Sequence, residues 1–227
     1  MQFFNNTLGA FFNFVHSGVA TIFPNKNISY GIAIIVFTII IRIILLPLNI
    51  KQMRSQLKMT DLQPEMQKLQ KKYKNDPQKL NTEMMKLYQE EGVNPLGGCL
   101  PLLVQLPILW ALFYVFKGLN MPHNTGFLWI KDLKQPDPYW ILPILSGAGT
   151  YLSSAMMMPS DSNDAQTKQT KLMNIVMSLF FVFTSRIFSA ALVLYYVFNS
   201  VFQVGQSYFM LLEQKKRKLK KLNKQKA

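Results

Sequence analysis

One basic residue lies deep inside an apolar segment of the sequence. Arg42 stands in the run GIAIIVFTIIIRIILLPLNI, eight residues before Ile50, which corresponds to roughly 12 Å of helix. A charge at that depth in a lipid bilayer costs from about 3 to more than 10 kcal/mol, depending on the estimate. All 11 acidic residues fall outside the apolar segments, so no carboxylate of the same chain is placed to neutralise it. We therefore expect Arg42 to face water, to bind polar groups, or to attract an acidic group of another molecule.

Other polar side chains recur at helical spacing in the apolar segments. They are Thr38 and Asn49 beside Arg42, Gln105, the series Ser146, Thr150 and Ser153, the series Asn174, Ser178 and Ser185, and the series Tyr195, Asn199, Gln203 and Gln206. Each set alone is expected to hydrogen-bond neighbouring helices, at well under about 2 kcal/mol per contact. Together with an unpaired arginine they favour a hydrated cavity that attracts anions. The structural alternative, in which Arg42 anchors the helices through polar neighbours, stays open.

Residues suited to covalent catalysis or metal binding are scarce. The two histidines, His16 and His123, lie outside the apolar segments, and the single Cys99 permits no disulfide within the chain. These residues cannot form a His-based triad or a metal cluster, and no glycine-rich phosphate loop precedes a helix. We expect no catalytic residue, no metal ligand and no cofactor, in a protein that is not an enzyme.

The elements that position Arg42 are predicted to be membrane helices. The composition combines 49% hydrophobic residues and 16% charged residues with a net charge of +14, and the charges are crowded into a few segments. The long stretches between them, almost free of charge, suit helices that are solvated by lipid. We expect an all-α membrane protein with five transmembrane helices around a hydrophilic groove, at residues 29–50, 95–117, 139–157, 172–186 and 187–212.

Two further helical segments complete this prediction. Residues 1–28 carry apolar side chains at steps of three and four with almost no charge, which predicts an amphipathic helix in the membrane interface or packed on the spans. Residues 51–94 predict a helical hairpin whose narrow apolar seams face each other. Asp76 suits the N-cap of its second helix, Pro77 the first position and Gly92 the end.

Basic residues set the predicted orientation. Nineteen Lys and Arg residues lie in 51–94, 158–171 and 213–227, against five in the segments on the opposite side, which include the predicted external loop 118–138. The positive-inside rule then places the N-terminus outside and the C-terminus in the cytoplasm. The basic tail, 213–227, is expected to be disordered, or helical only when bound, and its charge suits anionic lipid as well as RNA.

Three stretches resemble the YidC/Oxa/Alb family of membrane-protein insertases, in its short form without a large external domain. They are RIILLPL at 42–48, the segment 62–108 with its run NPLGGCLPLLVQLPI, and LVLYYVFNSVFQVGQ at 192–206. The similarity covers nearly all of the chain from about residue 29 onward. It implies five spans around a groove that is open to cytoplasm and lipid but closed outward. Groove water and the arginine would draw in the polar, often acidic, tail of a substrate, whose apolar segment then slides into lipid.

By position, the resemblance assigns the groove arginine of the family to Arg42. Its polar position in the third span falls on Ser154 or Ser153, where some members carry Gln, and its aromatic position in the fifth span falls on Tyr196, where some have Trp. The resemblance also implies that the hairpin is mobile and required, and that the tail helps to contact ribosomes. The residues predicted to line the substrate-binding groove are Thr38, Arg42, Gln105, Ser153, Ser154, Tyr196, Asn199 and Gln203.

These observations predict a multi-pass protein of the bacterial cell membrane that inserts newly made membrane proteins and helps them to fold. The expected partners are nascent membrane proteins, the ribosome and the lipid bilayer, with the Sec translocon as a further candidate and no small-molecule substrate. The alternative is a small anion transporter or channel that uses Arg42. It would be expected to show internal repeats, and the two halves show no self-similarity. A passive ribosome-tethering scaffold, a third class, would not need Arg42.

Overall fold

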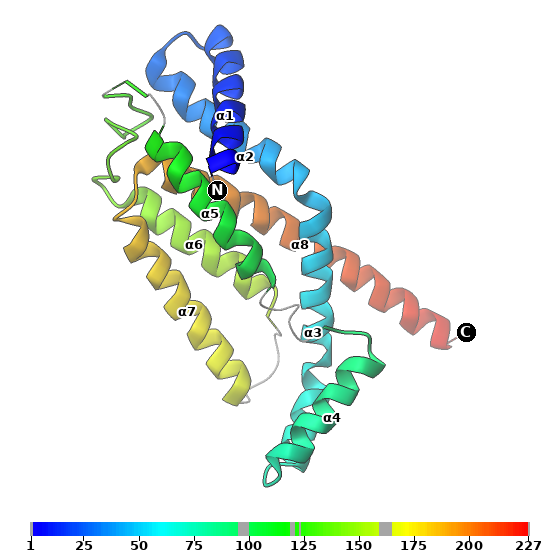
Figure 1. Ribbon diagram of the computed structural model, residues 1–227. Helices are drawn as coiled ribbons and strands as arrows, with labels where there is room; N and C mark the ends of the chain where they lie inside the picture. Colours follow the sequence, from blue (N-terminus) through cyan, green and yellow to red (C-terminus); the bar gives the residue numbers. More distant parts are fainter. Residues whose placement is uncertain (1, 95–99, 119–120, 123, 159–164, 227) are drawn as a thin grey trace.

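The computed structural model describes residues 2–94, 100–118, 121–122, 124–158 and 165–226. Over these residues the chain is helical, and its one extended pairing is an isolated bridge between Phe127 and Ile130. The helices are α1 (Gln2–Ile22), α2 (Lys26–Ile44), α3 (Leu46–Lys72), α4 (Pro77–Glu90), α5 (Leu100–Gly118), α6 (Ile141–Met156), α7 (Ala165–Ser185) and α8 (Ala190–Lys226) (Figure 1). The all-α prediction is confirmed. Cys99, His123 and residues 159–164 of the predicted loop 158–171 lie outside the described residues.

Helix α1 packs on other helices through its apolar face. Phe12 is fully buried, and its ring lies 5.5 Å from that of Phe37 in α2 and 5.8 Å from that of Phe116 in α5, between ring centroids. Val15 and Val19, on the same face, are also buried. The amphipathic pattern allowed this helix to lie in the membrane interface or to pack on the other helices. The structure favours packing on the other helices.

The chain breaks between α2 and α3, inside the range that we assigned to the first span. Helix α2 ends at Ile44, Leu45 lies between the helices, and α3 begins at Leu46 with Pro47 in its first turn. Pro47 has no N–H to donate to the carbonyl group of Ile43, so one continuous helix would lose a hydrogen bond there. Residues 45–50 therefore belong to the break and to α3, which leads away from α2 toward α4 (Figure 1).

Small residues bring α6 close to both α7 and α8. A Cβ atom at Gly147 would lie 2.3 Å from Val182 Cγ2 of α7, and one at Gly149 would lie 2.2 Å from Ser200 Oγ of α8. Both distances are shorter than real Cβ contacts, so a larger residue at either position would force Val182 or Ser200 to shift. Helix α6 is thereby held between its two neighbours (Figure 1).

Helix α8 is longer than the predicted fifth span. It continues without interruption to Lys226, through the basic segment for which we expected disorder in the free chain. At 37 residues it extends for about 55 Å, well beyond the thickness of a hydrocarbon core. Its last turns project from the other helices (Figure 1).

The apolar surface of the described helices suits a lipid environment. Among the described residues, α2 is the one helix that is both long and apolar enough to span a membrane by composition, with a mean hydropathy of 2.1. Helix α7 exposes a continuous apolar surface to solvent, which a soluble monomer rarely does. Its exposed side chains include Leu172, Ile175, Val176, Leu179, Phe180 and Phe183. The number of five spans stays a prediction.

The loop between α5 and α6 caps two helices at one end of the molecule. The carbonyl groups of Leu133 and Gln135 accept hydrogen bonds from Ala191 N at 2.9 Å and Ala190 N at 2.8 Å, the first two residues of α8. The fully buried Asp137 accepts from Leu142 N in the first turn of α6, at 2.7 Å. It also accepts from Tyr139 N at 3.1 Å and from the indole N–H of Trp129 at 3.3 Å. A single carboxylate therefore joins the loop to α6.

Replacing Asp137 with alanine should destabilise this end of the protein. The change removes three acceptor contacts, including a helix cap, so we expect the free energy of unfolding to fall by about 2–3 kcal/mol. Denaturant unfolding in mixed micelles measures this. Asp132→Ala is the matched control, because Asp132 accepts from Lys134 N within one local turn and should cost less than about 1 kcal/mol. An equal decrease in the free energy of unfolding for both variants would show that the contacts of Asp137 stabilise the protein no more than the local turn of Asp132.

The 51–94 segment folds as the predicted hairpin of α3 and α4. The Asp76 side chain accepts from Lys79 N at 3.0 Å, with Pro77 in the first turn of α4. After α4, Gly92 has a φ of +59°, and Val93 N donates to the carbonyl group of Tyr88 at 2.9 Å. This is a glycine-terminated helix end of the Schellman type, as predicted for Gly92. The buried side chains between the helices are Leu62, Met66, Tyr88 and Val93.

A histidine joins α1 to α2. The His16 ring stacks on Tyr30 with 3.8 Å between centroids, and its Nε2 atom lies 3.3 Å from Ser29 Oγ. Partial burial lowers the pKa of His16 below its ordinary value of 6.5. The neutral ring is therefore the form that fits this contact.

Acid should loosen the packing of α1. Because the pKa is lower in the folded state than in the unfolded state, the unfolded state binds the proton more readily. Stability is then complete above about pH 6.5 and decreases as the pH falls below that value. Thermal unfolding between pH 7.5 and pH 5.0 should show a larger decrease for the wild type than for His16→Gln, which cannot titrate. Parallel curves for the two proteins would contradict this assignment.

Candidate functional site

Arg42 is buried and bonds to a single residue of α8. It lies in the last turn of α2 and is 7% exposed. Its Nε atom donates to Asn199 Oδ1 at 2.5 Å, and its Nη2 atom donates to the carbonyl oxygen of Asn199 at 2.8 Å. Both acceptors are neutral. Of the three environments expected for Arg42, the structure shows polar side-chain and backbone acceptors.

The positive charge of Arg42 is stabilised but not neutralised. The ion pairs among the described residues do not include Arg42. Its place near the C-terminus of α2 sets it at the negative end of the helix dipole, which favours a cation by up to about 1–2 kcal/mol. Two hydrogen bonds from a charged donor add about 1.5–3 kcal/mol each. These contributions hold the guanidinium in place and leave its net charge available to an anion.

A buried tyrosine completes the surroundings of Arg42. Tyr195 lies one helical turn before Asn199, is 2% exposed and lies close to Arg42. The resemblance pointed instead to the next residue, Tyr196, which is half-buried against Phe181 of α7, with ring centroids 5.9 Å apart. The sequence could have predicted the position of Tyr195, because Tyr195 and Asn199 are four residues apart and therefore share a helix face.

Gln105 of α5 lies close to the side chains of both Tyr195 and Tyr196. Its Nε2 atom is buried and makes no hydrogen bond to a described residue. The structure therefore brings four residues of α2, α5 and α8 together. These are Arg42, Gln105, Tyr195 and Asn199, with Tyr196 at the edge.

The other residues predicted for the groove do not contact Arg42 through hydrogen bonds. Thr38 donates to the carbonyl group of Ile34 at 2.6 Å and Ser153 donates to that of Thr150 at 3.2 Å, each within its own helix. Both side chains are buried. Ser154 is half-buried and Gln203 is exposed. Their assignment to a groove stays a prediction.

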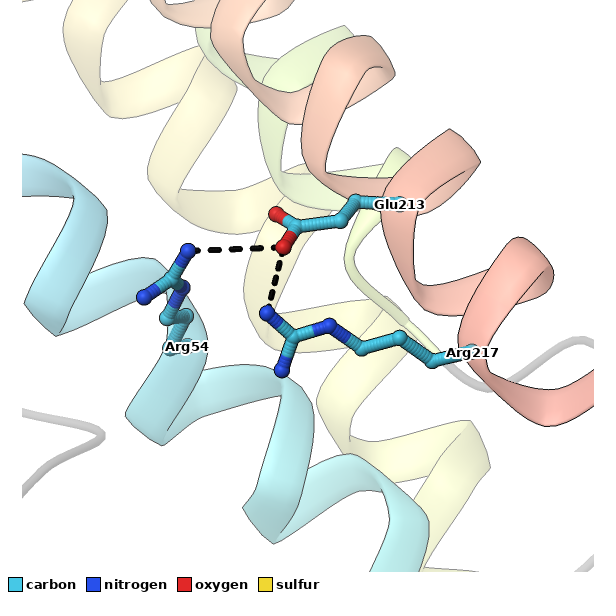
Figure 2. A network of polar contacts seen from close by, with 3 residues as sticks. All are labelled: Arg54, Glu213 and Arg217. Atoms are coloured by element: carbon cyan, nitrogen blue, oxygen red, sulfur yellow. Dashed lines mark hydrogen bonds and ion pairs between the residues drawn. The ribbon is translucent and has the colours of Figure 1, made fainter. Parts of the chain in front are cut away.

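A second polar contact joins α3 to α8 beyond Arg42. Glu213 Oε1 lies 3.4 Å from Arg54 Nη2 of α3 and 2.5 Å from Arg217 Nη2 of α8 (Figure 2). Arg217 and Arg54 hold the pKa of Glu213 below its usual range. Nearby, Gln214 Nε2 donates to Asp61 Oδ2 at 2.8 Å. Both arginine side chains are exposed and that of Glu213 is partly exposed, so solvent screens these ion pairs and they hold the helices together only weakly.

An apolar cluster lies beside this polar contact. It consists of Met53 and Leu57 of α3, Met210 of α8 and Met157 at the end of α6, all buried. Thr60 of α3 adds a hydrogen bond to the carbonyl group of Met157 at 3.2 Å. We call these contacts, together with those of Glu213 and Gln214, the α3–α8 clamp. Sequence periodicity did not predict it, because its members come from three separated segments.

Comparison with known proteins identifies the family. A family model described as 60Kd inner membrane protein matches residues 22–218. The chain belongs to this family. Its relatives are named membrane protein insertase YidC, which confirms the resemblance seen in the sequence.

The similarity extends over most of the chain and of its short relatives. The protein from Clostridium tetani is 49% identical over 91% of this chain and 93% of its own length, and that from Clostridium acetobutylicum is 52% identical over 89% and 82%. The longer relative from Wolinella succinogenes is 42% identical, over 83% of this chain and 35% of its own. A solved structure, an active YidC insertase with its first transmembrane domain resolved, matches with a TM-score of 0.69 and 33% identity. That match covers 90% of this chain and 45% of the solved chain.

The contact between Arg42 and Asn199 should be measurable as stability. Asn199→Ala removes the side-chain acceptor but keeps the backbone carbonyl, so we expect the free energy of unfolding to fall by about 2 kcal/mol. Ser200→Ala is the control, because Ser200 is equally buried but donates to Val197 of its own helix. Denaturant unfolding in mixed micelles compares the two variants. A similar loss for both would mean that Asn199 contributes by packing alone.

Proposed function

We propose that this chain is a membrane-protein insertase that moves segments of newly made membrane proteins from the cytoplasm into the bilayer. Its relatives over nearly its whole length carry the name of this activity. The observation that supports the proposal most directly is the buried charge of Arg42, whose hydrogen bonds to described residues go to two neutral acceptors of Asn199. A buried charge of this kind makes folding less favourable. Its presence is explained if Arg42 binds an anionic group of a substrate.

The proposed mechanism is electrostatic and involves no change of covalent bonds. Arg42 attracts the acidic tail of a substrate into a hydrated groove, whose lining we assign to the predicted residues with Tyr195 added. Tyr195, Asn199 and Gln105 supply hydrogen bonds that replace part of the tail's hydration. The apolar segment of the substrate then leaves toward lipid along the exposed apolar helices. The groove lowers the cost of carrying a short polar tail across the membrane.

The proposed arrangement in the membrane follows from charge and length. Five spans at the predicted ranges place α1 and the 118–138 loop outside, and the α3–α4 hairpin and the basic end of α8 in the cytoplasm. The eight cations of residues 213–227 suit contact with ribosomal RNA or with anionic lipid. The Sec translocon is a further candidate partner. A small anion transporter finds no support in the comparisons.

Substitutions at Arg42 test the proposal in proteoliposomes with a purified single-span substrate that carries an acidic tail. Arg42→Ala should lower the inserted fraction about tenfold, equivalent to about 1.4 kcal/mol, whereas Arg42→Lys should restore part of it because the charge is kept. Asn199→Asp should also lower insertion, because it provides a carboxylate that competes with the substrate. Protease protection of the tail measures insertion.

Arg186→Ala is the matched control. Arg186 lies over the Trp140 ring, 5.5 Å from its centroid, and is outside the proposed groove. Its loss should leave insertion unchanged. If Arg42→Ala, Arg42→Lys and Asn199→Asp all insert the acidic substrate like the wild type, charge attraction by Arg42 is wrong.

A further inference from the structure

Leu128 lies at the tip of a tight turn in the loop between α5 and α6, and it is 73% exposed. Phe127 and Ile130 exchange two backbone hydrogen bonds of 2.9 Å, so Leu128 and Trp129 are the two central residues of this turn. Leu128 has a φ of +53°, a left-handed conformation that glycine adopts freely and that strains a leucine. Such strain persists only where the surrounding structure imposes it. The turn therefore holds a large apolar side chain in the open, in an unfavourable conformation.

The neighbours of Leu128 fix the turn on the first two turns of α2. The Phe127 ring packs so closely on Gly31 that a Cβ atom at residue 31 would collide with it. Next to Phe127, Gly126 N donates to Asn27 Oδ1 at 3.1 Å. These contacts hold the backbone of the turn in place while the Leu128 side chain stays exposed.

The turn lies beside the surface of α2 that suits lipid. Ile28, Ile39 and Ile43 are 42%, 39% and 56% exposed, and their helical spacing places them on one face. Asn27 and Gly31, which contact the turn, lie on the neighbouring face. With 19 residues α2 extends for about 28 Å, close to the roughly 30 Å of a hydrocarbon core. The turn at its beginning is therefore level with one boundary of that core.

A cation directly follows the turn. Lys131 is exposed, and the ion pairs among the described residues do not include it. Its long apolar stem can lie along an apolar surface while the ammonium group reaches the headgroups. An ammonium group near the membrane surface attracts an anionic lipid, and an exposed leucine gains free energy by leaving water. Leu128 and Lys131 together match the two halves of a phospholipid.

We propose that the 127–130 turn binds an anionic phospholipid of the outer leaflet. The Leu128 side chain enters the upper part of the acyl chains, and the Lys131 ammonium group contacts the lipid phosphate. This inference rests on the proposed arrangement in the membrane, in which the 118–138 loop lies outside. It goes beyond the proposed insertion of substrates, because it concerns a lipid site at the opposite end of α2 from Arg42.

The lipid contact also sets the depth of Arg42. The turn is fixed on α2 at Gly31, and Arg42 lies roughly 16 Å further along the same helix. A turn that is held at the outer boundary of the hydrocarbon core therefore holds the arginine in the cytoplasmic half of the membrane.

Quenching by spin-labelled lipid tests the position of Leu128. The dye NBD is attached to Leu128→Cys in the full chain with Cys99→Ser, in vesicles of phosphatidylethanolamine and phosphatidylglycerol. A nitroxide near the headgroup end of the acyl chains should quench this dye strongly. The same dye at Gln135→Cys, an exposed position of the same loop, should keep most of its intensity. Both leaflets carry the quencher, so the orientation of the chain does not matter. Equal quenching at the two positions overturns the proposal.

A second dye position keeps the native leucine. With NBD at Lys131→Cys, the variant Leu128→Asn removes the apolar side chain but tolerates the left-handed backbone. Quenching of the dye at residue 131 should decrease in this variant, because the turn loses its hold on the acyl chains. The near-ultraviolet circular dichroism spectrum should stay unchanged. Unchanged quenching excludes the lipid contact of Leu128, and loss of the spectrum assigns it a structural role instead.

Headgroup selectivity tests Lys131. Spin-labelled phosphatidylglycerol should be enriched beside the dye at residue 128 about fivefold over spin-labelled phosphatidylcholine, the factor for one cation near an anionic surface. Lys131→Gln should remove this preference. Lys86→Gln, which removes the same charge from an ion pair of α4, should keep it. A preference that survives Lys131→Gln contradicts the assignment of the phosphate to this lysine.

Two further outcomes identify a different occupant or separate this proposal from the insertase function. Quenching that decreases as the protein-to-lipid ratio rises would show that a second copy of the chain covers Leu128, and would exclude lipid. The quenching experiments contain no substrate. If they succeed while Arg42→Ala inserts the acidic substrate normally, the charge mechanism fails and the lipid site stands.

Discussion

A guanidinium among apolar helices must be given acceptors, and in this structure one residue provides them. The two bonds from Arg42 to the side chain and the backbone of Asn199 require α2 and α8 to lie in one register and α8 to have one rotation. With Asn199 turned toward α2, the next residue, Ser200, meets α6 at Gly149, where no Cβ atom would fit. The arginine contact and the close crossing of α6 are therefore consistent with a single orientation of α8. Changes that rotate α8 would disturb both at once.

The sequence predicted the features that depend on local chemistry. The Asp76 cap and the Gly92 helix end follow from side-chain acceptors and from the left-handed backbone that glycine tolerates, and both are in place. Arg42 was recognisable because no acidic residue falls in an apolar segment. Its hydrogen-bond partner was not recognisable, because the polar side chains at helical spacing offered many acceptors. Only the packing of α2 on α8 selects Asn199. The polar series that contains Asn199 also contains Tyr195, so the sequence did indicate that these two residues share a helix face.

The sequence was less informative about segments that are compatible with two different environments or conformations. The apolar face of α1 would suit lipid as well as protein, and the ring contacts of Phe12 decide for protein. Pro47 is compatible with a kinked span or with the first turn of a new helix, and the backbone at Leu45 adopts the second arrangement. Asp137 stands between two prolines in a loop, a pattern that suggests an exposed turn, yet its carboxylate is fully buried as a cap. Burial of a charge in a loop has no signature in local sequence.

The separation between Arg42 and Asn199 has a consequence for synthesis of the protein itself. The two residues are 157 positions apart, and at translation rates of about 5–20 residues per second Asn199 follows Arg42 by roughly 8–30 s. During that interval Asn199, which provides both acceptors, has not yet been synthesised. The growing chain must carry a cation without these acceptors until α8 has been made. In its own biogenesis this protein therefore presents the kind of problem, a polar group in transit through lipid, that its family is named for solving.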